Sequence, residues 1–132
     1  MKLAKNALIA VVDGEHLALF RNTADTGLRL TPANTPDLDT SGGGSGDRTS
    51  SAGNPDSKTQ NEDAFAAAVA ERLNKIAITG NADEILVIAA PKTLGELRKH
   101  WHGQLKSRLV GEISKDLNGQ SPEKITAAIE AA

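Results

Sequence analysis

The sequence predicts one α/β domain built on a mixed five-stranded sheet, an antiparallel three-strand meander joined by two parallel strands, with about three helices. Three observations carry this prediction. Two apolar runs, at residues 7–12 and 17–20, flank an Asp-Gly pair near the start. The run EILVIAA at 84–90 has the length and composition of a strand buried on both faces. Between and after these runs, apolar residues recur at helical spacing.

Composition limits the function classes. A chain of 132 residues suits one domain, here 1–132. With two Phe, one Trp and no Tyr, the core must be aliphatic, and few rings are available to stack on bases. The absence of Cys excludes disulfides, thiolate metal sites and cysteine nucleophiles. The apolar run at the start is too short to span a membrane, so we expect a cytoplasmic protein that does not bind a membrane.

The first three strands follow from turn chemistry. Asp13-Gly14 separates the first two apolar runs, and Asp-Gly is a strong hairpin signal because the tight turn needs positive φ angles. At 27–31, Leu28 and Leu30 alternate with Arg29, which is typical of an edge strand. The first thirty residues therefore predict an antiparallel meander.

The segment at about 32–60 is rich in Gly, Ser and Pro and contains SGGGSG at 41–46. Such a composition cannot bury enough apolar surface to offset its ordering entropy, so we expect a flexible loop. It is not a phosphate-binding loop, because it lacks the Gly-Lys-Ser/Thr ending. A flexible linker is the favoured interpretation, and the alternative is a loop that orders on binding a partner through Gly42, Gly43, Gly44 and Arg48.

The first helix is expected to begin near Asn61, which suits an N-cap and is followed by two acids. Phe65, Val69, Leu73 and Ile76 then recur at helical spacing, and Gly80 is the expected stop.

A second helix is expected from Leu94 to about Trp101. Thr93 and Glu96 have the spacing of a capping box, in which each side chain satisfies a backbone donor of the first turn.

The chain ends with a strand and a helix. LVGEIS at 109–114 predicts the last strand, and Ser121-Pro122 opens a final helix with Ile125 and Ile129 on one face. Because buried runs occupy the first and fourth strands, we expect these two to lie side by side in the middle of the sheet, with right-handed crossovers. This arrangement is a ribonuclease H-like sheet.

Three stretches carry a family resemblance: Val12-Asp13-Gly14, APKTLGELR at 90–98, and VGEISKDL at 110–117. Together they resemble the bacterial host-attachment protein family, which is related to the middle domain of archaeal and eukaryotic class-one release factors and of Pelota. The match covers nearly the whole chain. It implies a ribonuclease H-like core, and the family name implies an accessory role in attachment to host cells, which would be indirect because no export signal is present.

In the release factors that the chain resembles, the loop after the meander carries Gly-Gly-Gln, which promotes release of the nascent peptide. Here that loop has Gly42-Gly43-Gly44 and no Gly-Gly-Gln. The Gly119-Gln120 pair falls in the turn before the last helix, where a turn-forming role is favoured. We therefore expect no enzymatic activity and no cofactor.

The stretch from 92 to 108 is the best candidate surface for RNA or the ribosome, although the whole chain carries a net charge of only −2. A basic helix that opens after the carboxyl end of a central parallel strand lies where open sheets bind ligands, and its first turn favours anions. The alternative is a solvated charged helix with its apolar side inward. The candidates for RNA or anion binding are Lys92, Thr93, Arg98, Lys99, His102, Lys106 and Arg108.

Two weaker alternatives remain open. Asp13 ends the first strand, where ribonuclease H-like nucleases keep a metal-binding carboxylate, and Asp63, Glu84 or Asp116 are the partners that two-metal chemistry would need. No acidic motif has diagnostic spacing, so we expect no metal. The Ala-rich stretches at 64–70 and 127–132 suit packing against a second copy, which leaves a homo-oligomer as an alternative.

Overall fold

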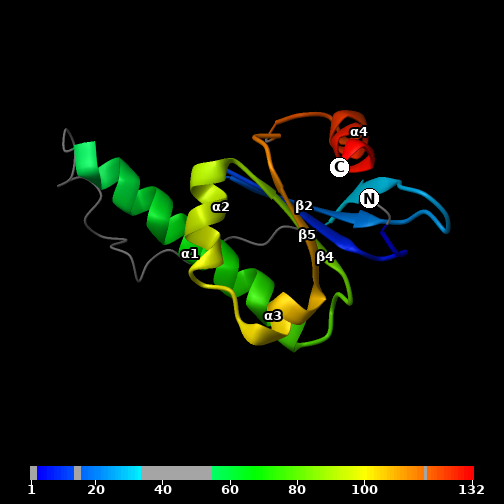
Figure 1. Ribbon diagram of the computed structural model, residues 1–132, viewed down its shortest axis with the longest axis horizontal. Coiled ribbons are helices and arrows are strands. Elements are labelled where there is room, and N and C mark those ends of the chain that lie inside the picture. The colour runs from blue at the N-terminus through cyan, green and yellow to red at the C-terminus, as the bar shows by residue number, and fades with distance from the viewer. Residues whose placement is uncertain (1–2, 14–15, 34–54, 118) are drawn as a thin grey trace.

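The computed structural model describes residues 3–13, 16–33, 55–117 and 119–132. Within them, one sheet is formed by β1 (Leu8–Val12), β2 (Leu17–Asn22), β3 (Leu30–Pro32), β4 (Ile85–Ala89) and β5 (Leu109–Ser114). The helices are α1 (Pro55–Ile78), α2 (Pro91–Arg98), α3 (Gly103–Arg108) and α4 (Pro122–Ala131). Figure 1 shows the sheet with α1, α2 and α3 to one side and α4 to the other.

The sheet confirms the predicted topology. Its strand order is β3-β2-β1-β4-β5. β1 pairs antiparallel with β2 and parallel with β4, and β4 pairs parallel with β5. All five residues of β1 and all five of β4 are buried, as two covered faces require. The first and fourth strands are therefore the neighbouring central strands that the sequence predicts.

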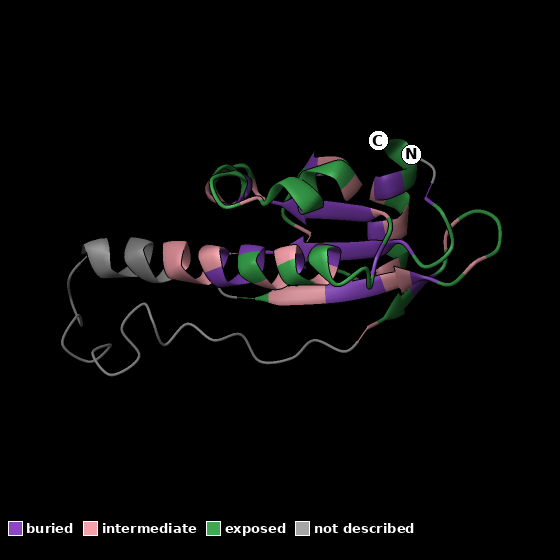
Figure 2. Ribbon diagram, turned by 90° about the horizontal axis from the view of Figure 1, so that it is seen from below, coloured by how far each residue is buried: buried purple, intermediate pink, exposed green. Residues whose placement is uncertain are grey.

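Two apolar layers fill the two sides of the sheet. Leu8, Ala10 and Val12 pack toward α1, α2 and α3, while Ile9 and Val11 pack toward α4. This alternation follows from the two-residue period of a strand. Figure 2 shows the buried residues concentrated along the central strands and on the inner sides of the helices.

The first helix begins at Pro55, so the prediction of a start near Asn61 is wrong, and residues 55–60 of the predicted loop are helical. Proline is well suited to the first turn, because its missing N–H would have no partner there. Apolar periodicity begins only at Phe65, so it gives no signal for the polar sequence PDSKTQ at 55–60.

The capping box at Thr93 is also wrong. α2 begins at Pro91, with Ala90 as an extended N-cap and no side-chain cap, so Thr93 lies inside the first turn. The helix ends at Arg98 rather than Trp101, and a separate short helix, α3, follows from Gly103. His102 caps α3 by accepting a hydrogen bond on Nδ1 from the Gln104 backbone N–H at 3.0 Å.

The last strand and the last helix agree with the predictions, whereas the third strand differs in its bounds. β5 has the predicted bounds, and α4 opens at Ser121-Pro122, where the Ser121 hydroxyl accepts from the Lys124 backbone N–H. β3 is shorter than predicted and shifted toward Pro32, because Gly27 turns the chain with φ +78°. The meander is thus real, but its third strand is only a three-residue edge.

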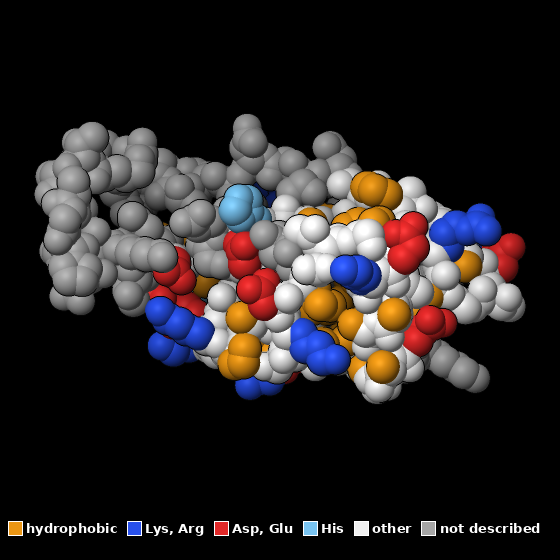
Figure 3. All heavy atoms as spheres, turned by 90° about the horizontal axis from the view of Figure 1, so that it is seen from above, with side chains coloured by type: hydrophobic (Ala, Val, Ile, Leu, Met, Phe, Trp, Pro, Cys, Tyr) orange, Lys and Arg blue, Asp and Glu red, His pale blue; other side chains and the backbone are white. Residues whose placement is uncertain are grey.

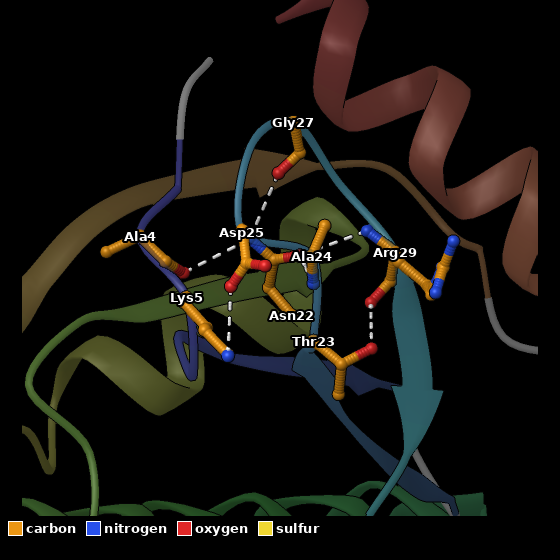
Figure 4. A network of polar contacts seen from close by, with 8 residues as sticks. All are labelled: Ala4, Lys5, Asn22, Thr23, Ala24, Asp25, Gly27 and Arg29. Carbon is orange, nitrogen blue, oxygen red and sulfur yellow. Dashed lines mark hydrogen bonds and ion pairs between the residues drawn. The ribbon is translucent and has the colours of Figure 1, made fainter.

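Asn22, at the end of β2, is completely buried and organises the β2–β3 connection. Its amide nitrogen donates to the carbonyl oxygens of Leu3, Ala4 and Gly27 at 3.1–3.2 Å. Its oxygen accepts from the backbone N–H groups of Ala24 and Arg29. Figure 4 shows the groups of Ala4, Ala24, Gly27 and Arg29 converging on this side chain, which ties the segment before β1 to the turn after β2.

Candidate functional site

The predicted basic surface is spread over two helices rather than one. α2 and α3 both pack against α1, so the cations of 92–108 lie on one side of the sheet. We call the surface of these two helices and their connection the α2–α3 face. Thr93 and Arg108 are half-buried on it, and the other candidates are exposed: Lys92, Arg98, Lys99, His102 and Lys106.

Arg98 is held by an acid of β5. Its Nε and Nη2 lie 3.0 and 2.9 Å from Oε1 of Glu112, while Trp101 donates from Nε1 to Oε2 at 3.2 Å. Burial acts to raise the pKa of Glu112, but the hydrogen bonds from Arg98 and Trp101 outweigh it, so this pKa lies below its ordinary value. The hydrogen bond to Glu112 in turn raises the pKa of Arg98. The guanidinium is therefore oriented by the sheet edge.

Lys99 is paired within its own turn. Its Nζ lies 3.0 Å from Oε2 of Glu96, and Nε2 of His100 lies 3.8 Å from Oε1 of the same carboxylate. The hydrogen bond from Lys99 lowers the pKa of Glu96, and the same bond raises the pKa of Lys99. Such an exposed pair contributes little to stability. It does balance part of the positive charge on this surface.

Asn74 of α1 fixes the connection between α2 and α3. Its amide nitrogen donates to the His100 carbonyl, and its oxygen accepts from the His102 backbone N–H, both at 2.9 Å. Because Nδ1 of His102 accepts the α3 capping bond, the hydrogen-bond network assigns the proton of its neutral ring to Nε2. His102, predicted as an RNA contact, therefore also has a structural role.

Lys92 and Lys106 are the cations that remain available. Each is exposed and forms no ion pair with any residue in the described ranges. Lys92 and Thr93 lie in the first turn of α2, where the backbone N–H groups have no acceptor within the helix. Arg108 donates from Nη1 to Oε1 of Gln104 at 3.1 Å. The α2–α3 face thus combines oriented and unpaired positive groups.

The positive excess is local. The stretch from 92 to 112 holds five Lys and Arg against Glu96 and Glu112. Figure 3 shows acidic and basic side chains interspersed on the face that it draws, with apolar side chains between them. A local excess on a chain of slightly negative net charge gives a confined attraction for anions.

Asp13 has a turn-forming role. Its carboxylate accepts from the His16 backbone N–H and lies 3.2 Å from Nδ1 of that ring, which closes the β1–β2 turn. Glu84, one of its predicted metal partners, lies at the opposite end of the sheet, because Leu8 pairs with Ile85 and Val12 with Ala89. In the part of the chain that the structure describes, no group of three His, Asp or Glu is placed to hold a metal ion.

Several sequence features bear on the site in other ways. Gly42, Gly43, Gly44 and Arg48, the predicted partner-binding loop, lie outside the described residues. A second Gly-Gln pair, Gly103-Gln104, forms the first turn of α3 and follows His102 rather than a glycine. None of the described helices is long and apolar enough to cross a bilayer.

Residues 6–129 match the model of a protein family described as bacterial archaeo-eukaryotic release factor family 12. The match runs from the segment before β1 to the last turns of α4, and so includes the whole sheet and the α2–α3 face. No curated protein matches the chain.

Proposed function

Because the chain belongs to bacterial archaeo-eukaryotic release factor family 12, we propose that it is a non-catalytic module that binds RNA, as free RNA or within the ribosome, through the α2–α3 face. The observation that carries the proposal is the arrangement of cations there. Lys92 and Lys106 are unpaired within the described residues, and the Arg98 guanidinium is oriented by Glu112. Lysines supply point charges for phosphate, and an oriented guanidinium adds directional donors.

The location also supports phosphate binding. α2 starts directly after the carboxyl end of β4, and its N-cap residue, Ala90, has no side chain that could accept from the first-turn N–H groups. These donors and the positive end of the helix dipole favour an anion next to Lys92. The few aromatic residues of the chain, and the half-burial of Trp101, argue against recognition by base stacking. We therefore expect contacts to phosphate and little sequence preference.

The non-catalytic part of the proposal depends on the missing catalytic motif. Gly-Gly-Gln occurs nowhere in the sequence, and both Gly-Gln pairs are preceded by another residue, His102 or Asn118. The nuclease alternative loses Glu84 as a partner of Asp13, because the two lie at opposite ends of the sheet. Among the described residues, no group of three His, Asp or Glu is placed to hold a metal ion. The indirect role in attachment stays a prediction of the family resemblance.

Substitution of the two unpaired lysines tests the RNA-binding proposal. We expect a short fluorescein-labelled RNA to bind the wild-type chain at low salt. The logarithm of the association constant should fall linearly with the logarithm of the salt concentration, and the steepness of this line is the salt slope. Each of Lys92→Gln and Lys106→Gln should reduce the slope by about 0.7, because each removes one phosphate contact. The measurement is fluorescence anisotropy over a salt series.

Lys124→Gln is the matched control, because Lys124 is exposed on α4, across the sheet from the α2–α3 face. It removes the same charge and should leave the slope unchanged. If wild-type protein shows no binding at low salt, or if Lys124→Gln lowers the slope as much as the other two, the RNA-binding proposal is wrong.

Glu112→Gln should change RNA affinity in the opposite direction. The substitution removes a negative charge from the α2–α3 face and leaves Arg98 without its ion-pair partner. We expect tighter RNA binding, because the carboxylate of Glu112 no longer repels phosphate or offsets the charge of Arg98. Weaker binding in this variant would show that the orientation of Arg98 by Glu112 matters more than the removal of this negative charge.

The same variant has a pH signature in stability. The pKa of Glu112 is lower in the folded chain, so its contribution to stability is present above its ordinary pKa of about 4.5 and is lost as the pH falls through the folded value. Thermal unfolding measured from neutral to acidic pH should therefore show a shallower acid-side decline for Glu112→Gln than for wild type. An identical decline would contradict this assignment.

A further inference from the structure

A cavity of about 580 Å³ opens at the end of the sheet opposite the first turn of α2. It lies where β1 and β4 begin. Its walls come from the chain before β1, from β2 and β3, and from the turn between α1 and β4. Its volume is within the range of pockets that hold small molecules. Because α2 starts at the carboxyl end of β4, this cavity is separate from the proposed RNA surface.

Arg21 of β2 is immobilised in the wall of this cavity. Its Nη1 donates to the Asn6 carbonyl at 2.9 Å and its Nη2 to the Asn81 carbonyl at 2.8 Å. These two bonds fix the guanidinium plane, and each terminal nitrogen keeps a second N–H. No carboxylate in the described ranges forms an ion pair with Arg21. A fixed cation with spare donors is thus present in a concave site.

The opposite charge lines the same cavity. Asp83, in the turn before β4, is exposed and has no hydrogen bond or ion pair to another described residue. Its neighbour Glu84 accepts from the Ala4 backbone N–H on Oε1 at 2.8 Å. Lys5 is already paired with Asp25 at 2.9 Å. Arg21 and Asp83 therefore remain as opposite charges that share one cavity without pairing with each other.

We propose that this cavity binds a short zwitterionic peptide, with the peptide carboxylate on Arg21 and its ammonium group beside Asp83. A ligand that carries both charges satisfies both groups, whereas a purely anionic ligand would be repelled by Asp83 and Glu84. None of the described residues that line the cavity is aromatic, so they offer a nucleotide base no stacking partner. Backbone carbonyls and the Thr23 and Thr31 hydroxyls in the walls suit the amide groups of a peptide.

Titration of ¹⁵N-labelled protein with triglycine tests the proposal. We expect saturable chemical-shift changes at the backbone amides of Asn6, Asn81 and Asp83. N-acetyl-triglycine lacks the ammonium charge and triglycine amide lacks the carboxylate, so each should bind about tenfold more weakly, as loss of one charged hydrogen bond predicts. Equal affinity for the three peptides, or shifts confined to other parts of the chain, would overturn the proposal.

Two variants assign the two ends of the ligand. Asp83→Asn should weaken triglycine binding about tenfold but leave N-acetyl-triglycine unaffected, because only the ammonium group uses this carboxylate. Arg21→Gln should weaken the binding of both triglycine and N-acetyl-triglycine. The NMR spectrum of this variant shows directly whether the turns at Asn6 and Asn81 stay in place. Because Asp83 is exposed, Asp83→Asn keeps the test decisive even if Arg21→Gln unfolds. Glu71→Gln, which removes an exposed acid of α1 outside the cavity lining, is the control and should change nothing.

The outcome is independent of the proposed RNA binding. Asp83→Asn should leave the salt dependence of RNA affinity at its wild-type value, because Asp83 lies at the opposite end of the sheet from Lys92. Equal affinity of triglycine for wild type and Asp83→Asn would contradict the proposed peptide site and would leave the proposal of RNA binding by the α2–α3 face unchanged.

Discussion

Replacement of Asn22 by leucine is expected to lower the free energy of unfolding by about 3–5 kcal/mol, because it removes the partners of several backbone groups at once. Leucine has the same branched arrangement of four side-chain heavy atoms but no polar atoms. The Leu3, Ala4 and Gly27 carbonyls would lose a donor, and two backbone N–H groups would lose an acceptor. Each buried polar group left without a partner costs about 1–3 kcal/mol. The part-buried groups can bind water instead, so the total is smaller than the sum of five such costs.

Urea unfolding followed by circular dichroism measures this effect. Thr23→Val is the matched control, because Thr23 is the next residue along the chain but is exposed, and its hydroxyl hydrogen bonds are open to solvent. We expect the control to lie within about 1 kcal/mol of wild type. Asn22→Asp should lower the free energy of unfolding at least as much as Asn22→Leu. Its carboxylate can still accept from the two backbone N–H groups, but it places a negative charge against three carbonyl oxygens. A loss of less than 1 kcal/mol for Asn22→Leu would show that water replaces the amide.

The role of Asn22 could not be predicted from the sequence, because its partners are spread from Leu3 to Arg29 and no local pattern marks them. The two hydrogen bonds of Asn74 could not be predicted for the same reason, since its partners lie 26 and 28 residues away. The central strands were predictable, because a strand covered on both faces must be apolar at every position. That requirement leaves a continuous run in the sequence, as at Ile85–Ala89.

Helix ends were less predictable than helix interiors. The spacing of Thr93 and Glu96 imitates a capping box, but Pro91 fits the first turn better and α2 starts two residues earlier than Thr93. α3 has six residues and one buried apolar side chain, Leu105, which is too little for a periodic signal. The charges of the site were visible in the sequence. Their pairing was not, because Glu112 reaches Arg98 from a different element.

Leu97→Ala is expected to lower the free energy of unfolding by about 3 kcal/mol. Leu97 has no exposed surface and packs with Leu94 and Leu105 in the layer between the helices and the sheet. Truncation of a buried leucine removes apolar contacts and leaves a cavity, which costs about 2–5 kcal/mol. Val110→Ala is the control, because Val110 on β5 is 41% exposed and its truncation should change stability by about 0.5 kcal/mol or less.

The same variant separates folding from RNA recognition. Leu97 carries no charge, and the first turn of α2 and the cations of the α2–α3 face are unchanged in Leu97→Ala. Under conditions where this variant is folded, its salt slope for RNA should equal the wild-type slope, whereas Lys92→Gln reduces the slope without loss of stability. A reduced slope in fully folded Leu97→Ala would mean that the packed position of α2 sets the number of phosphate contacts. Phosphate recognition would then depend on the helix anchor and not only on its surface charges.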